Sequence, residues 1–172
     1  DERAAYDEAL GALVDGRYAE SARRFAAFLQ QYPDGDYADN ATYWLGESYY
    51  VTQNYQVALE TFQDLLARFP DSSKAPDALL KVGYSHYELK DWPQAESVLD
   101  QVVERYPDTT AARLAQGRLR ALRLEGSRID HEQQLPLRDA LPVLEVHGED
   151  GPCHAGAHLD GIHRLETAGV IV

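Results

Sequence analysis

The sequence predicts an all-α protein, namely an α-solenoid of three helix pairs followed by a C-terminal capping helix and an irregular tail. The first observation is a repeat of 37 residues: Tyr32-Pro33-Asp34 returns as Phe69-Pro70-Asp71 and again as Tyr106-Pro107-Asp108. The second is the spacing of apolar residues by three and four within each unit, which places them on one helix face. The same step links Tyr18, Tyr55 and Trp92; Phe25, Phe62 and Leu99; and Ala41, Ala78 and Ala115. Agreement at so many positions indicates a helical repeat array.

We expect helix pairs at about residues 2–33, 39–70 and 76–107. Within each pair, a short polar turn joins the two helices, and the second helix ends at the aromatic-Pro-Asp sequence. Proline disfavours the α conformation in the residue before it and cannot continue the helix. Four small residues should let the paired helices approach closely: Gly46, Gly83, Ala58 and Ala95. The conservative interpretation of the matched aromatic and small residues is core packing.

A single helix at residues 110–124 takes the place of a fourth first helix, with arginines along its surface. A polar terminal helix is what the end of a solenoid requires. We therefore place one domain at residues 1–126 and a tail at residues 127–172. The tail contains no aromatic residue, and we leave open whether it is an accessory extension, a non-native addition or a segment without fixed structure.

Composition excludes several function classes. The formal net charge is −13, which argues against a nucleic-acid or anionic-lipid partner because like charges repel. No apolar run approaches the ~18 residues of a membrane span, so we expect no direct membrane insertion. The chain has no Met and begins at Asp1, and we expect a preceding segment. Its one Cys cannot form an internal disulfide.

The repeat unit resembles a tetratricopeptide repeat (TPR). The residues that carry the resemblance stand in the order and at the spacing of that family: Leu45-Gly46, Tyr49, Ala58, Phe62 and Pro70. The unit departs from the usual 34 residues because its loops after the proline are longer. The first repeat has Ala9 where Gly is expected and Ser21 where Ala is expected, and the third has His86 where Tyr is expected.

A narrower resemblance rests on YADNATYWLGESYY at residues 37–50 and SSKAPDALLKVGYS at residues 72–85. These stretches resemble the TPR domain of the Tol–Pal system periplasmic proteins known as YbgF or CpoB, the cell division coordinators. The resemblance implies a periplasmic protein that binds TolA and links the Tol–Pal system to a cell-wall synthase complex. It also implies a full-length trimer formed through an N-terminal coiled coil. The alternative is a TPR-type lipoprotein of the β-barrel assembly machinery, and the upstream sequence would distinguish the two.

Stacked helix pairs form a curved array whose first helices line the concave side, which offers a groove for a protein partner. Helical phase predicts that eight residues face this groove: Tyr6, Asn40, Tyr43, Glu47, Tyr50, Asp77, Tyr84 and Tyr87. Leu10, Leu13, Leu80 and Glu88 share the same phase. Tyrosine suits protein interfaces, and the surplus of acid over base favours a Lys- or Arg-bearing partner. The alternative is that some of these tyrosines close the seams between repeats. Lys81 is the only obvious basic candidate, so we expect no carboxylate clamp.

Neither catalysis nor a cofactor is predicted. The repeats contain no Gly-rich phosphate loop, and their one histidine, His86, stands at a seam position and is interpreted as a packed residue. Cys153, His154, His158 and His163 could be read as metal ligands. Nearby glycines and Pro152 interrupt any long helix, and the spacing matches no zinc pattern, so we predict no metal site.

Overall fold

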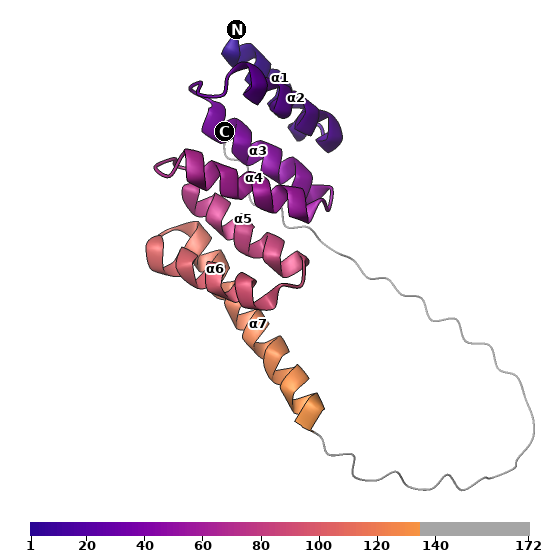
Figure 1. Ribbon diagram of the computed structural model, residues 1–172, viewed down its shortest axis with the longest axis vertical. Helices are drawn as coiled ribbons and strands as arrows, with labels where there is room; N and C mark the ends of the chain where they lie inside the picture. The colour runs from indigo at the N-terminus through magenta and orange to yellow at the C-terminus, as the bar shows by residue number, and fades with distance from the viewer. Residues whose placement is uncertain (135–172) are drawn as a thin grey trace, which may run out of the picture. The chain divides into compact units, whose positions relative to one another are not determined.

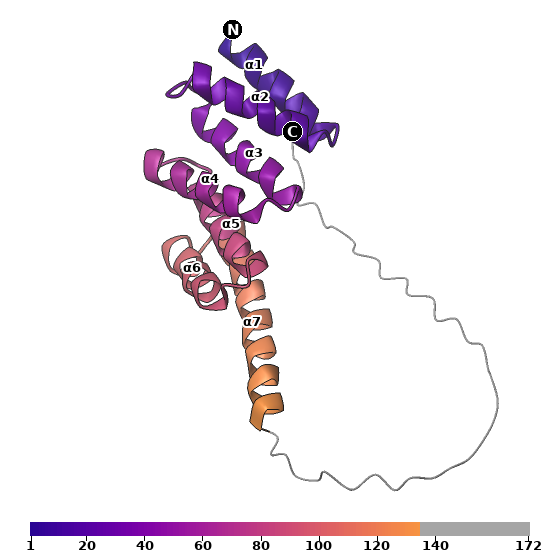
Figure 2. The ribbon, with the colours of Figure 1, turned by 45° about the vertical axis from the view of Figure 1, so that its right-hand side comes forward.

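The computed structural model describes residues 1–134, which form seven α-helices and no strand (Figure 1). Successive helices stack side by side in chain order, as the rotated view in Figure 2 also shows. The helices are α1 (Glu2–Val14), α2 (Tyr18–Gln31), α3 (Ala38–Val51), α4 (Tyr55–Arg68), α5 (Ala75–Glu88), α6 (Trp92–Arg105) and α7 (Thr110–Gln134). The predicted fold class, an all-α solenoid of helix pairs, is confirmed for this part of the chain.

The turns within the helix pairs share one backbone geometry. Gly16, Gln53 and Lys90 occupy the same place in successive units, and each has a positive φ, at 75°, 63° and 62°. In each turn the next backbone N–H returns to the carbonyl five residues earlier, as from Asn54 to Tyr49 at 2.9 Å. This is the Schellman type of helix ending, which satisfies carbonyls that the helix itself leaves free. The predicted polar turns thus reverse the chain at equivalent points in every unit.

Glycines let the two helices of a pair approach. A Cβ built on Gly46 would lie 2.6 Å from the Phe62 ring, and one on Gly83 would lie 2.8 Å from Leu99 Cδ2. Phe62 and Leu99 are both fully buried, so each fills the space that the facing glycine leaves. In the first pair, where Ala9 replaces this glycine, the Ser21 hydroxyl donates a hydrogen bond to the Ala9 carbonyl at 3.1 Å. Ala9 and Ser21 depart from the repeat pattern, and the hydrogen bond between them still joins the two helices of the first pair.

The last helix is longer than predicted. The sequence prediction ended it at residue 124, whereas α7 continues to Gln134. The stretch after Leu124 contains one isolated glycine, which a helix tolerates, and no proline before Pro136. Of the predicted tail, residues 127–134 therefore lie in a helix, and residues 135–172 lie outside the described part of the chain.

Helix α7 differs from the other first helices at the position that contacts the paired second helix. The position of Gly46 and Gly83 is occupied in α7 by Arg120, whose side chain is exposed. A further second helix could not approach this residue as α4 approaches Gly46. The described helices include none with both the length and the hydropathy that crossing a membrane requires.

Candidate protein-binding surface

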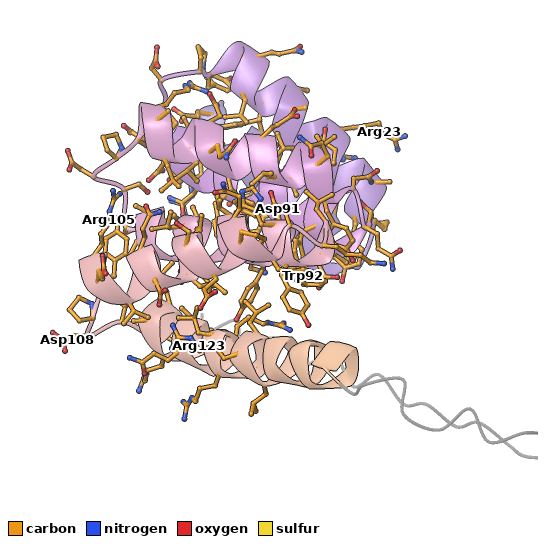
Figure 3. All side chains as sticks on the ribbon, turned by 60° about the horizontal axis from the view of Figure 1, so that its bottom comes forward. Arg23, Asp91, Trp92, Arg105, Asp108 and Arg123 are labelled. Carbon is orange, nitrogen blue, oxygen red and sulfur yellow. The ribbon has the colours of Figure 1, made fainter. Side chains whose placement is uncertain are left out.

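The first helices of the units line one side of the array. Direct contacts between alternate helices join α1 to α3 and α5 to α7. The helix-pair turns and the loops between units lie at opposite edges, as Asp91 and Trp92 show against Arg105 and Asp108 (Figure 3). We define the concave surface as the side lined by α1, α3, α5 and the start of α7.

Two of the predicted groove residues are core residues instead. Tyr6 and Tyr43 are each only 8% exposed. Tyr6 stacks on Tyr37 with ring centroids 4.9 Å apart, and Tyr43 lies 5.7 Å from the Phe62 ring. The Lys74 ammonium lies over the Tyr43 ring, 5.1 Å from its centroid. The groove prediction is therefore wrong for Tyr6 and Tyr43, because the chain entering the next unit covers this position.

The other six predicted residues are half-buried and lie on first helices: Asn40, Glu47, Tyr50, Asp77, Tyr84 and Tyr87. Four of them contact a side chain from the next first helix. Lys81 Nζ lies 2.8 Å from Glu47 Oε1 and donates a hydrogen bond to Oε2 at 2.9 Å, and it lies 4.8 Å from the Tyr50 ring centroid. The Arg118 guanidinium lies 5.0 Å from the Tyr84 ring centroid and 4.5 Å from that of Tyr87.

The side chains that make these contacts come from one repeated position. Trp44, Lys81 and Arg118 are separated by 37 residues and reach back onto the preceding first helix. Trp44 does so by donating its indole N–H to the Tyr6 hydroxyl at 3.1 Å. A cation over a tyrosine face is attracted by the ring quadrupole, an interaction worth roughly 0.5–2 kcal/mol. The contacts of Trp44, Lys81 and Arg118 with the preceding first helices thus stabilise the packing between units, and they fix the side chains of the concave surface.

Several acidic side chains of this surface have partners. Glu47 is neutralised by Lys81, and Asp39 accepts a hydrogen bond from Ser72 at 2.5 Å. Glu88 accepts one from the Tyr50 hydroxyl at 3.4 Å. Sequence reasoning counted Lys81 alone as basic and missed Arg118. The 37-residue register of Trp44, Lys81 and Arg118 was the signal that could have found it.

Tyr50 and Tyr84 of the concave surface keep their protons at neutral pH. Burial raises the pKa of Tyr50 above its ordinary value, and the carboxylate of Glu88 adds to this effect. Burial also raises the pKa of Tyr84, although the neighbouring Arg118 acts in the opposite direction. Both phenols therefore remain neutral hydrogen-bonding groups at the tips of large apolar rings, a composition suited to a protein interface.

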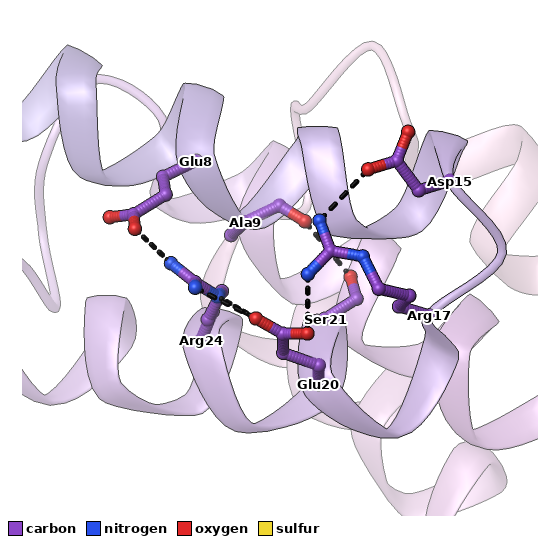
Figure 4. Close-up of polar contacts among 7 residues, drawn as sticks. All are labelled: Glu8, Ala9, Asp15, Arg17, Glu20, Ser21 and Arg24. Carbon is purple, nitrogen blue, oxygen red and sulfur yellow. Dashed lines mark hydrogen bonds and ion pairs between the residues drawn. The ribbon is translucent and has the colours of Figure 1, made fainter.

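Other polar clusters have structural explanations. Arg24 pairs with Glu8 and Glu20, and Arg17 with Glu20 and Asp15, which forms an ion network on the surface of α1 and α2 (Figure 4). Networks this exposed contribute little stability, because water screens them. Within residues 1–134, no three His, Cys, Asp or Glu side chains converge as metal ligands. The predicted candidates Cys153, His154, His158 and His163 lie outside the described residues.

His86 lies at the end of α5, with Nδ1 3.4 Å from Asp91 Oδ2. Its side chain is 14% exposed, as expected for a packed residue at a seam.

Comparison with known proteins identifies the family. A family profile described as YfiO, outer membrane lipoprotein, matches residues 1–123, which is most of the chain. The chain belongs to this family. It also carries a TPR domain similar to that of the cell division coordinator CpoB of Pseudomonas putida, with 41% identity over 46 residues. That match covers 27% of this chain and 17% of the relative, so it concerns only part of CpoB.

Solved TPR structures share the fold at low sequence identity. The Sgt2 TPR domain of Aspergillus fumigatus has a TM-score of 0.65 and 13% identity, covering 83% of this chain and 90% of that one. PcrH of Pseudomonas aeruginosa has a TM-score of 0.61 and 17% identity, covering 70% and 90%. The first TPR domain of Spaghetti (RPAP3), solved with an HSP90 peptide, has a TM-score of 0.62 and 15% identity, covering 73% and 93%. At these identities the likeness concerns the fold alone.

Proposed function

We propose that this chain is a non-catalytic protein-interaction module of the bacterial cell envelope, and that it binds its partner on the concave surface. The observation that carries the proposal is the row of half-buried tyrosines, Tyr50, Tyr84 and Tyr87, held in place by cations of the next helix. Rigid aromatic residues with polar tips are typical of binding surfaces. Membership of an outer membrane lipoprotein family supports the location in the envelope.

In its specific form, the proposal is a periplasmic role in the Tol–Pal system. The partners would be TolA and a cell-wall synthase complex, so that peptidoglycan synthesis keeps pace with outer-membrane constriction during division. The similarity to CpoB supports this form, together with the two stretches that resemble its family. The same resemblance is the basis for proposing that the full-length protein is a trimer.

A second candidate is a scaffold for outer-membrane protein assembly within the β-barrel assembly machinery. The match of residues 1–123 to the YfiO family favours it, because that match covers more of the chain than the similarity to CpoB. The two candidates share the binding surface and differ in the partner.

Charge reversal on the concave surface tests the site. Asp77 is half-buried on α5 and acts through its charge on the buried Tyr43. We expect Asp77→Arg to weaken binding of the TolA periplasmic region at least about tenfold in calorimetry, because one like-charge or steric conflict in an interface costs on the order of 1.4 kcal/mol.

The matched control is Asp64→Arg on the exposed face of α4, which gives up an i,i+4 pair with Arg68 at 3.2 Å. Such a pair is worth only about 0.3–0.5 kcal/mol, so this variant should fold and bind normally. Equal loss in both variants would move the site away from the concave surface. Binding of an assembly-machinery partner in place of TolA would select the second candidate.

A further inference from the structure

We propose that Arg118 is the anchor of a carboxylate-binding site on the concave surface, one that takes an Asp or Glu side chain within a partner segment. The inference rests on the proposed function and adds a chemical requirement for the partner. It also reverses part of the sequence prediction, which expected acidic residues in the groove and a basic partner.

The repeat itself shows what Arg118 lacks. Lys81 occupies the same position one unit earlier, and its charge is met by Glu47 on the preceding first helix, 2.8 Å away. The residue equivalent to Glu47 in the next unit is Tyr84. Arg118 therefore lies beside tyrosine rings where its predecessor has a carboxylate, and its guanidinium is hydrogen-bonded to the Tyr84 side chain. Among the described side chains, no carboxylate forms an ion pair with it, whereas Lys81 is paired with Glu47. The charge of Lys81 is neutralised within the chain, whereas the charge of Arg118 is available to an external acid.

The geometry leaves the guanidinium able to bind an anion. Its carbon lies 4.5 Å from the Tyr87 ring centroid and 5.0 Å from that of Tyr84, so the two rings hold it in place. A guanidinium has five N–H donors in one plane, and contact with aromatic faces does not consume them all. A carboxylate can then accept two parallel hydrogen bonds, and the rings shield the pair from water.

The surroundings indicate which carboxylate fits. Trp92 packs edge-to-face on Tyr87 with ring centroids 5.0 Å apart, and it remains 41% exposed. The site is thus an aromatic surface with one cation that no described carboxylate neutralises, which matches an acidic side chain beside a bulky apolar residue. Asp77, further along α5, provides a negative charge for a basic residue of the same segment. A single cation provides one bidentate contact, which is enough for one side-chain carboxylate.

The probe is the tripeptide acetyl-Leu-Asp-Leu-amide, which carries a side-chain carboxylate and no free terminus. Titrated into the ¹⁵N-labelled chain, it should shift the Arg118 Nε–H resonance and the ring resonances of Tyr84 and Tyr87 saturably. We expect acetyl-Leu-Asn-Leu-amide to bind about tenfold or more weakly, because it lacks the charge-assisted pair. No saturable shift with the Asp peptide would show that Arg118 only packs on the rings.

Three arginine variants test whether peptide binding depends on Arg118 itself. Arg118→Gln should weaken binding of the Asp peptide about tenfold, and Arg118→Lys should give an intermediate value because it keeps the charge but loses the fork. Arg113→Gln removes the same charge from α7, where the exposed Arg113 side chain donates a hydrogen bond to the Thr110 hydroxyl at 3.0 Å, and should bind within about twofold of the parent. Thermal melting would confirm that each variant is folded. Stronger binding of acetyl-Leu-Leu with a free carboxylate would overturn the assignment to a side chain.

Capture of envelope proteins separates this inference from the function on which it rests. If the unmodified chain and Arg118→Gln capture the same partner equally, the carboxylate site is wrong and the proposed function stands. If the unmodified chain captures no envelope protein, the proposed function fails, while the peptide titration still reports on Arg118.

Discussion

Replacing Phe62 by Ala is expected to lower the free energy of unfolding by about 3–5 kcal/mol, the usual cost of removing a buried aromatic side chain. Phe62 is completely buried and lies at the centre of the second unit, where its ring faces Gly46 and lies 5.7 Å from the Tyr43 ring. Its removal would leave a cavity between α3 and α4 that the rigid seam cannot close. Urea denaturation followed by circular dichroism measures the loss.

The control for Phe62→Ala is Val57→Ala on the same helix, where the side chain is 43% exposed. Truncation there should change the free energy of unfolding by no more than about 0.5 kcal/mol. A similar loss in both variants would contradict the description of Phe62 as the core of the seam.

Substituting Ala at two glycines should shift stability in opposite directions. A Cβ on Gly46 would lie 2.6 Å from the buried Phe62 ring, whereas one on Gly117 would have nothing within 4 Å. Overpacking costs about 1–3 kcal/mol, which exceeds the gain from removing glycine from a helix. We therefore expect Gly46→Ala to lower the melting temperature.

At Gly117 only the helix propensity changes, and alanine should raise the free energy of unfolding by about 0.5–1 kcal/mol. Both variants are measured by thermal melting under identical conditions. Stabilisation by Gly46→Ala would show that α3 and α4 are further apart than the structure places them.

The helices could be predicted from the sequence because several independent signals agree. The aromatic-Pro-Asp endings stop α2, α4 and α6 at Gln31, Arg68 and Arg105. The polar turns needed a left-handed residue, and Gln53 and Lys90 adopt it although neither is glycine. The helix endings depend on local backbone chemistry that the sequence shows directly, whereas the residue types of Gln53 and Lys90 do not indicate their left-handed conformation.

The depth of burial on the concave side was less predictable. Helical phase showed that Tyr43 shares a face with Glu47 and Tyr50, but not that Lys74 from the following loop would cover it. The position of Arg118 over Tyr84 and Tyr87 likewise depends on how two units stack. Periodicity within one helix gives the direction of a side chain, whereas contacts between units decide what remains exposed.

Site-specific photo-crosslinking tests most directly whether the concave surface binds the partner. We would place p-benzoylphenylalanine at Asn40 or Asp77 on first helices, and at Gln63 or Gln94 on the exposed faces of α4 and α6. The account predicts crosslinks to one envelope protein from Asn40 and Asp77 and none from Gln63 or Gln94. Crosslinks from Gln63 or Gln94 alone would contradict it and place the interface on the second helices.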